Sequence, residues 1–276
     1  MVMSVNTNVS AQVALQNLNA TNAQLATTQS RINTGLKISS AKDNGAIWAI
    51  AQGQRADIGA LNAVKQSLDR GVAATDVAMA AGETVSDLLL QMKEKALAAT
   101  DKSLKTAARA ALNEDFKALR DQIASVTKNA EFNGVNLLKT GADGFTALAN
   151  AEGTASLTVP AEVMDLGSTT VTVSVTQSIE TMTKANTTLA AVNASIDNVS
   201  GALARLGTKS KALTTHLTFV GKLSDALESG VGNLVDADLA KESAKLQALQ
   251  TKQQLGVQAL SIANQTPQLV LSLFRG

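Results

Sequence analysis

The C-terminal segment 235–276 constrains the fold most, because it carries no charged side chain between Gln253 and Phe274. Its apolar residues recur at intervals of eleven: Val235, Leu246 and Val257, and again Leu249, Leu260 and Leu271. Eleven residues make three turns of a nearly relaxed helix, so we predict one long helix with a steady apolar stripe. A surface helix normally has a charged face. This segment is therefore either a poorly patterned terminal helix or one buried among copies of itself, where amides can pair.

The N-terminal segment has the same character, since its first charged residue is Arg31. Leu18, Leu25 and Ile32 are spaced by seven, and Asn, Thr, Gln and Ala fill most other positions. We predict that the two uncharged ends are helices that pack together. The expected packing residues are Val13, Leu18, Leu25, Ile32, Leu249, Leu260, Pro267, Leu271 and Leu273.

Pro267 has two interpretations. In the middle of the terminal helix it costs about 3 kcal/mol, because it lacks an amide donor. Alternatively, Thr266 caps a new turn that has Pro267 at its first position. In either case, burial of the terminal apolar side chains falls short of the backbone entropy lost on ordering so long a hairpin. We therefore expect the ends to be ordered only in an assembly.

Composition narrows both the architecture and the function. Aromatic residues make up 2% of the 276 residues and the only prolines are Pro160 and Pro267, which favours long, slender, alanine-rich helices over a thick core. The net charge is +1 without a basic run, so no nucleic-acid or anionic-membrane partner is expected. Cysteine is absent, which excludes disulfides and thiolate chemistry. The N-terminus lacks a Sec-type signal, and no run is long enough to span a membrane.

Helical patterns cover most of the region between the two ends. Apolar spacing predicts a helix over about 41–97 and an antiparallel second helix over about 103–129. Another is predicted over about 179–231, with a hinge at Gly230–Gly232 leading into the terminal helix. The fold class is mainly α, a long antiparallel bundle or coiled coil built from both ends of the chain. We expect an inner domain of residues 1–40 and 235–276, and a bundle domain of 41–234.

Residues 139–177 differ from the rest because glycines break the helical pattern there. Apolar residues alternate with Ser and Thr over Ser156–Pro160 and again over Thr170–Thr176. A period of two is typical of a half-buried strand. We therefore predict one or two small β-hairpins that lie on the helices.

Most catalytic arrangements are missing. His216 is the only histidine, so a two-histidine zinc motif cannot form. A Ser-His-Asp triad would use this histidine and leave no other imidazole as a spare base. No phosphate-binding or dinucleotide-binding glycine motif is present. We expect no enzyme activity, no cofactor and no metal, and we place His216 on a helix flank. Trp48, the only tryptophan, is expected to be a buried packing residue, with an interface anchor as the alternative.

Three segments together give the chain a specific family resemblance. They are Val5-Asn6-Thr7-Asn8, then Thr34 to Asn44 (TGLKISSAKDN), and Ala263 to Leu273 (ANQTPQLVLSL). They resemble the Ile-Asn-Thr-Asn start, the S-G-L-R-I-N-S-A-K-D-D segment and the A-N-Q-x-P-Q-x-V-L-S-L end of bacterial flagellins. Phe132-Asn133-Gly134-Val135 is similar to the F-N-G-V turn of that family. The likeness covers about the first 140 and last 95 residues, as in short flagellins without outer variable domains, including alphaproteobacterial ones.

The resemblance implies a structural subunit of the extracellular flagellar filament. It implies self-polymerisation, unfolded export through the flagellar type III apparatus, a cytosolic chaperone for the C-terminal region, and contact with cap and hook-associated proteins. It also implies that the segment after the first helix contacts neighbouring subunits, through Gly35, Lys37, Ser39, Lys42 and Asp43. The alternatives are a hook-associated junction protein or another type III-secreted coiled-coil protein. An enzyme-bearing filament is disfavoured by the single histidine and the short middle.

Two departures from the family pattern have expected consequences. Gly45, Ile47 and Trp48 stand where the family commonly has small residues, so packing and the preferred filament form are expected to differ. The patch read by the vertebrate innate flagellin receptor corresponds to Leu90, Gln91, Glu94 and Lys95. Gln91 replaces the usual arginine and loses its charge and forked donors, so we expect weak receptor activation.

Overall fold

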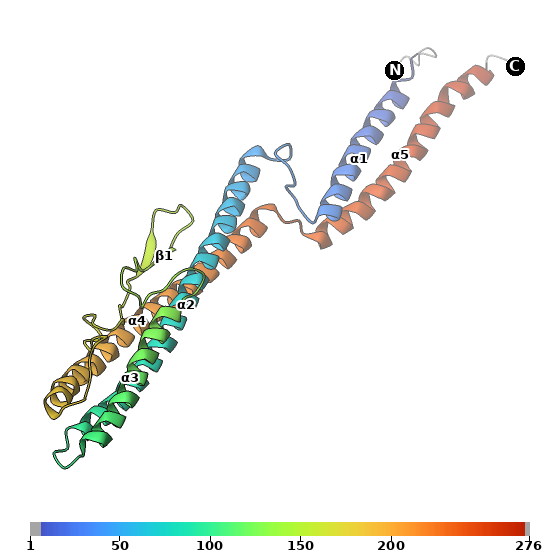
Figure 1. Ribbon diagram of the computed structural model, residues 1–276. Helices are drawn as coiled ribbons and strands as arrows, with labels where there is room; N and C mark the ends of the chain where they lie inside the picture. The colour runs from blue at the N-terminus through green and yellow to red at the C-terminus, as the bar shows by residue number, and fades with distance from the viewer. Residues whose placement is uncertain (1–6, 274–276) are drawn as a thin grey trace. The chain divides into compact units, whose positions relative to one another are not determined.

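The computed structural model describes residues 7–273, with side chains from 7 to 265. Over these residues the elements follow in the order α1 (Val9–Thr34), α2 (Gly45–Ala99), α3 (Thr106–Asn129), β1 (Phe145–Leu148), β2 (Ser156–Val159), α4 (Met182–Val235) and α5 (Leu239–Leu273) (Figure 1). The mainly helical fold class with one small β-hairpin is thus confirmed. Within residues 7–273, no helix combines the length and apolarity needed to cross a membrane.

The chain divides into two compact units, each described separately below. The hairpin unit comprises Met1–Ala56 and Ala226–Gly276, and the bundle unit comprises Asp57–Asp225. Both boundaries fall inside helices, because α2 and α4 each contribute residues to the two units. The expected division after residues 40 and 234 into an inner domain and a bundle domain stays a prediction.

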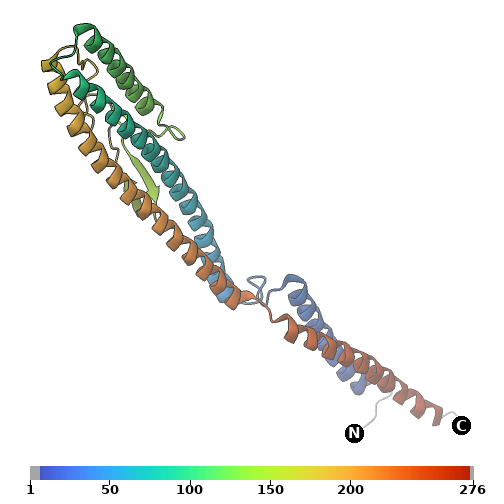
Figure 2. The same ribbon diagram turned by 90° about the horizontal axis from the view of Figure 1, so that it is seen from below.

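The bundle unit has a continuous apolar core. The α2, α3 and α4 helices lie side by side in both views, and their inward positions are fully buried (Figures 1 and 2). The largest of these side chains include Leu68, Leu89 and Met92 of α2, Phe116 and Ile123 of α3, and Leu206 and Leu213 of α4. Tight packing of this kind requires small residues where elements approach most closely. At Gly82, a Cβ atom would lie 2.8 Å from Cδ2 of Leu203, so glycine lets α4 approach α2.

The β-hairpin packs against this core. Its strands β1 and β2 pair antiparallel with Phe145 opposite Val159, and they present the buried Ala147 and Val159 to the helices. A Cβ atom on Gly71 of α2 would lie 2.7 Å from Cε1 of Phe145, so the hairpin depends on a glycine to sit this close. The strand predicted at 156–160 is therefore present, and β1 is a strand that the alternation pattern did not reveal.

The second predicted strand, at 170–176, is absent. Val171 and Val173 are buried as the alternation implies, but this segment forms only an isolated bridge instead of a ladder. The amide of Thr172 donates to the hydroxyl of Ser195 on α4, at 2.9 Å. Apolar and polar residues alternate in this segment because it lies on α4. The helix covers every second side chain, so no neighbouring strand is needed.

The joint between α4 and α5 also lies elsewhere than expected. We predicted a hinge at Gly230–Gly232, whereas α4 continues through these residues to Val235. The backbone of Asp236 instead forms an isolated antiparallel bridge with Leu36, and the Asp238 carboxylate accepts an amide from the first turn of α5. Backbone pairing and capping after Val235 therefore set the joint, and the predicted glycine hinge is wrong.

Candidate functional site

The α1 and α5 helices pair along a heptad seam. The less exposed positions of α1 alternate in spacing between three and four: Ala11, Ala14, Leu18, Thr21, Leu25, Thr28 and Ile32. The matching positions of α5 are Glu242, Leu246, Leu249, Gln253, Gly256, Leu260 and Ala263. This spacing is typical of a two-helix coiled coil. It differs from the eleven-residue stripe expected in α5, since Val257 belongs to that stripe and is 53% exposed.

Three polar contacts fix the antiparallel register of this helical hairpin. Asn8, which caps α1, donates from Nδ2 to the backbone oxygen of Ala263 at 2.7 Å. One end of the seam is thereby tied. Further along, Gln253 donates to Asn22 at 2.8 Å, and Arg31 donates to Glu242 at 3.1 Å. The partner numbers fall along α5 as they rise along α1, as antiparallel pairing requires.

The seam buries little apolar surface for its length. Among the described residues of the seam, Leu249, at 6% exposed, is the only large apolar side chain in the fully buried class, and Thr21 and Thr28 are buried with it. Thr21 donates its hydroxyl back to the Asn17 carbonyl. The buried Thr28 hydroxyl and one buried oxygen of Glu242 have no hydrogen-bond partner among the described residues. Unsatisfied polar atoms weaken a packed contact, so the hairpin is held loosely by its own residues.

Outside the seam, the surface of the hairpin exposes large apolar side chains. Val9, Val13, Leu255, Val257 and Ile262 are 64%, 52%, 60%, 53% and 67% exposed, respectively. The surrounding positions of α1 up to Arg31, and of α5 after Lys252 up to residue 273, carry no charge. A large apolar surface without charges is typical of a protein–protein interface. Leu255 and Val257, two positions apart, point to different sides of α5. We therefore use the name outer face for the whole exposed surface outside the seam that carries these five residues.

The structure distributes the predicted packing residues over both faces. Leu18, Leu25, Ile32 and Leu260 are half-buried in the seam and Leu249 is buried there. Val13 instead lies on the outer face. The side chains of Pro267, Leu271 and Leu273 lie outside those described, although α5 continues as one helix through position 267 and no new turn starts there. The prediction did not include Thr21 and Thr28. They lie three residues after Leu18 and Leu25, at the second apolar position of each heptad, so a full heptad pattern would have included them.

Residues 35–44 form a compact elbow after α1. Gly35 ends the helix in the left-handed region with φ 71°, and its carbonyl accepts the amide of Ala237 at 2.9 Å. The amides of Lys37 and Ile38 both donate to the carbonyl of Val235, at 2.7 and 3.3 Å. Ile38 is buried beneath them. The elbow is thus tied to the end of α4 by backbone contacts.

Asp43 closes the elbow. Its Oδ2 accepts the amides and hydroxyls of both Ser39 and Ser40 at 3.0–3.1 Å. These donors, first the Ser39 hydroxyl, hold the pKa of Asp43 below its ordinary value of 3.8. Asn44 then caps α2 by accepting the amide of Ile47 at 3.2 Å. Ser39, Ser40, Asp43 and Asn44 therefore each have a local structural role.

The elbow and α1 enclose a hollow of about 250 Å³. Its lining is Ala26, Thr27, Ser30, Arg31, Lys37, Ser39 and Asp43. The structure thus brings Lys37, Ser39 and Asp43 of the predicted subunit-contact set to one place, with Gly35 beside them in sequence. Lys42 is exposed on the same loop. Whether these residues touch another subunit stays a prediction.

The predicted receptor patch lies on α2 in the bundle unit. Leu90 is 50% exposed, and Gln91 and Glu94 are exposed with it. Lys95 is half-buried and donates to Asp115 of α3 at 2.9 Å, a hydrogen bond that raises the pKa of Lys95. The patch thus presents an apolar side chain, an amide and a carboxylate, while its lysine is held by the neighbouring helix.

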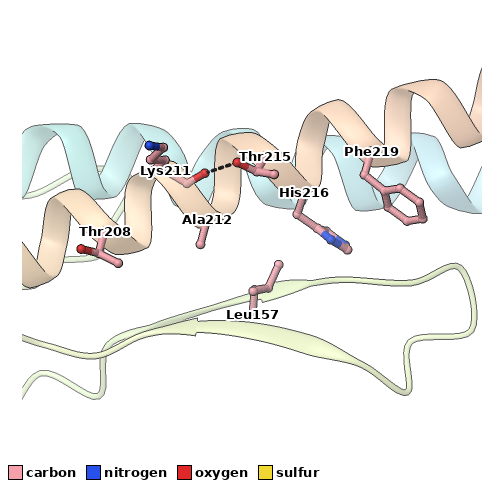
Figure 3. Close-up of a pocket in the computed structure, with 7 residues that line it drawn as sticks. All are labelled: Leu157, Thr208, Lys211, Ala212, Thr215, His216 and Phe219. Atoms are coloured by element: carbon pink, nitrogen blue, oxygen red, sulfur yellow. Dashed lines mark hydrogen bonds between the residues drawn. The ribbon is translucent and has the colours of Figure 1, made fainter.

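The only histidine holds the β-hairpin against α4. His216 Nε2 lies 2.7 Å from the carbonyl oxygen of Ala149, and its ring centroid lies 5.8 Å from that of Phe219. The shallow groove beside it, about 500 Å³, is lined by Leu157, Thr208, Lys211, Ala212, Thr215, His216 and Phe219 (Figure 3). Within this lining, Thr215 donates to the carbonyl of Lys211. No carboxylate or second imidazole stands there to assist acid–base chemistry, and the described residues contain no metal-binding cluster.

Comparison with known proteins shows which family this chain with paired helical ends belongs to. The family model of the bacterial flagellin N-terminal helical region matches residues 5–142, and that of the C-terminal helical region matches residues 189–274. The chain belongs to the bacterial flagellin family. Flagellin FljM of Caulobacter vibrioides is 58% identical over 276 residues, covering 99% of this chain and 98% of that protein.

More distant relatives agree with this family assignment. A flagellin of Brucella melitensis is 37% identical over 289 residues and covers 99% of both chains. A solved structure described as a flagellar hook-associated protein from Vibrio parahaemolyticus has a TM-score of 0.57. It is 15% identical and covers 70% of this chain, so this likeness shows a shared fold alone. Because whole-length identity lies with flagellins, the predicted family is confirmed and the hook-associated alternative is not favoured.

Proposed function

We propose that this flagellin polymerises into the extracellular flagellar filament by completing its hairpin unit on neighbouring copies. The observation that carries the proposal is the contrast between the two faces of the α1/α5 hairpin. Over the described residues, the seam holds α1 and α5 together with one buried large apolar side chain, whereas the outer face leaves five exposed. Burying that face against other subunits supplies the apolar contact that the single chain lacks. Ordering of the ends is then coupled to assembly.

The elbow has a second role in the proposal. Gly35, Lys37, Ser39, Lys42 and Asp43 would contact a neighbouring subunit, because the hollow lined in part by Lys37, Ser39 and Asp43 offers hydroxyls and a lysine without an ion pair among the described residues. The Oδ2 atom of Asp43 already accepts four hydrogen bonds within the loop. Its part is therefore to hold the loop in shape, while the exposed lysines make the contact.

The remaining partners follow from family membership. A chain of this kind would leave the cell unfolded through the flagellar type III apparatus, after a cytosolic chaperone has held its uncharged C-terminal region. It would then fold at the filament tip beneath cap proteins. At the filament base, subunits would contact hook-associated proteins. Marginal stability of the hairpin supports this route, because a loosely held segment unfolds readily for export.

Removing residues 253–276 tests the proposal directly. We expect the truncated chain to keep the bundle unit, since the core side chains of α2, α3 and α4 lie outside the deletion. Its urea-unfolding midpoint, followed by circular dichroism, should match that of the full chain. Electron microscopy should show no filaments from the truncated protein and long filaments from the full chain. Filaments from the truncated protein would refute the proposal.

A point substitution separates the outer face from the hairpin itself. Val257→Lys places a charge on the outer face, and assembly would then have to bury that charge at high cost. Ser243→Lys is the matched control, because Ser243 is also exposed on α5 but lies beside the existing charges Lys241 and Glu242. We expect only Val257→Lys to stop filament growth from wild-type seeds. Equal growth of the two variants would show that the outer face stays open in the filament.

We also propose that this flagellin activates the vertebrate innate flagellin receptor weakly. Gln91 is exposed and offers no charge or forked donor set where the family carries arginine. Restoring it as Gln91→Arg should increase the response of a receptor reporter cell line, and Lys93→Arg on the same helix is the control. A full response to the unaltered protein would contradict the proposal.

A further inference from the structure

The start of α2 carries an aromatic side chain that its own chain does not cover. Trp48 is half-buried, in contrast to the expected core position, and its indole N–H donates to no group among the described residues. Next to it Ala51 is completely buried, so α2 packs on its own unit through a neighbouring side. A buried tryptophan normally finds a hydrogen-bond acceptor. An indole that is half open with a free donor is typical of an interface residue waiting for a partner.

The residues that share this side of α2 fit the same interpretation. Gln52 and Arg55 lie four and seven positions after Trp48, which places all three on one helix face. Arg55 is exposed, and no acid of the described chain forms an ion pair with it. Lys42, in the loop just before α2, is likewise unpaired. We call Trp48, Gln52 and Arg55 the basic-aromatic face. Tryptophan and arginine are the residues most enriched among binding hot spots.

The bundle unit carries a face of opposite character. Glu83, Asp87, Leu90, Glu94 and Leu97 follow one another on α2 at spacings of four and three, so they form a single stripe. All five are exposed, with Leu90 and Leu97 at 50% and 56%. None of the three acids has an ion-pair partner among the described residues. We call these five residues the acidic-leucine stripe.

The two faces match in charge, in apolarity and in spacing. The basic-aromatic face offers an indole and a guanidinium two turns apart. The acidic-leucine stripe offers two leucines two turns apart, with the Glu94 carboxylate between them and Asp87 and Glu83 before them. Trp48 can pack on a leucine while Arg55 pairs with a carboxylate. Complementary potentials of this kind select a partner and suppress pairing of two like faces.

We propose that the basic-aromatic face of one copy docks on the acidic-leucine stripe of a second copy of this chain. Two different faces of one chain make a heterologous contact, which repeats without closing and so builds an open polymer. The proposal rests on the proposed filament function and names one of the contacts within it. In this contact, Trp48 of one copy packs on Leu90 and Leu97 of the second copy and contributes most of the apolar burial.

The native chain is suited to a direct test, because Trp48 is its only tryptophan and tyrosine is absent. On polymerisation of the full chain, we expect the Trp48 emission to shift to shorter wavelength and its quenching by acrylamide to fall severalfold. Trp48 that stays as quenchable in filaments as in monomers would overturn the proposal. A chain that forms no filaments at all would instead refute the proposed function, so the two failures are distinguishable.

Cross-linking identifies the partner surface. Because the chain contains no cysteine, Gln52→Cys provides one attachment point for a benzophenone label on the basic-aromatic face. Filaments grown from mixed nitrogen-14 and nitrogen-15 protein are irradiated, and the linked peptides are mapped by mass spectrometry. We expect links between copies to residues 83–97. Ala46→Cys, exposed on another side of α2 near its start, is the control and should not link there. Links from position 52 to any other segment would overturn the proposal.

Charge reversal measures the strength of the contact. Arg55→Glu should raise the critical concentration for elongation about tenfold or more, because removing a hot-spot arginine from an interface has effects of that size. Lys222→Glu reverses an exposed charge outside both faces and should leave the critical concentration unchanged. Elongation of Arg55→Glu at the wild-type concentration would count against the proposal, since the guanidinium would then have no carboxylate partner.

Discussion

The two units of this flagellin differ in how much apolar surface each buries within one chain. The largest fully buried side chains, from Val64 to Leu213, all lie within the bundle unit. The described part of the α1/α5 seam contains instead buried threonines, a glycine facing Leu18 and a single buried leucine. The bundle unit is therefore complete as one chain, whereas the hairpin is complete only when other subunits cover it.

The difference is already present in the residue types of the helices. Where α2, α3 and α4 face one another, leucine, isoleucine, methionine and phenylalanine are fully buried together with valine and alanine. Where α1 faces α5, leucine and isoleucine are mixed with threonine, glutamine, alanine, glycine and glutamate, and most positions are only half-buried. Each large apolar side chain is worth about 1.5–3 kcal/mol when fully buried, so replacing half of them removes about half of this driving force. A subunit that must travel unfolded and fold at its destination gains from keeping its stable part separate from its assembling part.

Substitution of Phe116 should cause the largest loss of stability and should affect the bundle unit alone. This side chain is completely buried in α3, so Phe116→Ala should cost about 3–5 kcal/mol through lost contact and a residual cavity. Urea unfolding of the monomer, followed by circular dichroism, should show a much lower midpoint. Leu25→Ala in the half-buried seam is the counterpart and should leave that midpoint unchanged. Equal shifts for the two variants would mean that the hairpin and the bundle unfold as one unit.

A second test concerns the backbone of the bundle unit. Gly144 has φ 80°, and a Cβ atom there would lie 2.5 Å from the carbonyl oxygen of Val159. Gly144→Ala should therefore destabilise the monomer by about 2–4 kcal/mol, because left-handed strain adds to a backbone overlap. Gly53, in the hairpin unit part of α2, has nothing within 4 Å of its Cβ position.

Gly53→Ala is the matched control for this pair. It should be neutral or stabilise α2 by up to about 1 kcal/mol, since alanine is the better helix former. Both values can be read from the same urea titration. If Gly144→Ala left the unfolding midpoint where it is, the close approach of the two backbones could not be part of the folded bundle.

The ion pair of the hairpin gives a third and smaller effect. Glu242 is 12% exposed, and one of its oxygens is held by Arg31 while the other is buried without a partner among the described residues. Arg31→Leu should weaken the hairpin by about 1–3 kcal/mol, toward the lower end because Arg31 itself is 30% exposed. Hydrogen exchange of α1 amides should accelerate in the monomer. In the double variant with Glu242→Gln, exchange should return toward the wild-type rate, and a failure to do so would exclude the pairing as the cause.

How far the fold can be predicted from the sequence depends on how local the determining signal is. The long helices were foreseen because their apolar periodicity lies within each segment. The strand β1 was not, since Phe145–Leu148 is too short to show an alternation and is fixed by pairing with β2. The segment around Val171 and Val173 misled in the opposite direction, because its alternation comes from contact with α4. Periodicity reports which side chains are covered, and it does not report what covers them.

The assembly surface was predictable in its chemistry but not in its geometry. The absence of charge at both ends identified helices that need a partner. The eleven-residue stripe, however, placed Val257 with Leu246 on one surface, whereas the structure puts Val257 on the outer face and Leu246 in the seam. An antiparallel pair selects its own contact line from a uniformly uncharged helix, and only the position of α1 decides which line that is. Trp48 is similar, since its exposure depends on which side of α2 packs on its own unit.

The elbow is expected to respond to acid, with the smallest effect of the series. The Ser39 and Ser40 donors lower the pKa of Asp43 below 3.8, so the charged form is favoured in the folded loop. A carboxyl group with a depressed folded pKa adds stability above its unfolded pKa, and this contribution is lost as the pH falls through the lower folded pKa. We expect the Ser39 and Ser40 amide signals in a monomer NMR titration to shift below about pH 4. Asp43→Asn should remove that transition, while Asp57→Asn, at an exposed position of the bundle unit, should keep it. A loop that stayed unchanged when Asp43 was protonated would show that the backbone contacts of Gly35, Lys37 and Ile38 hold the elbow without this carboxylate.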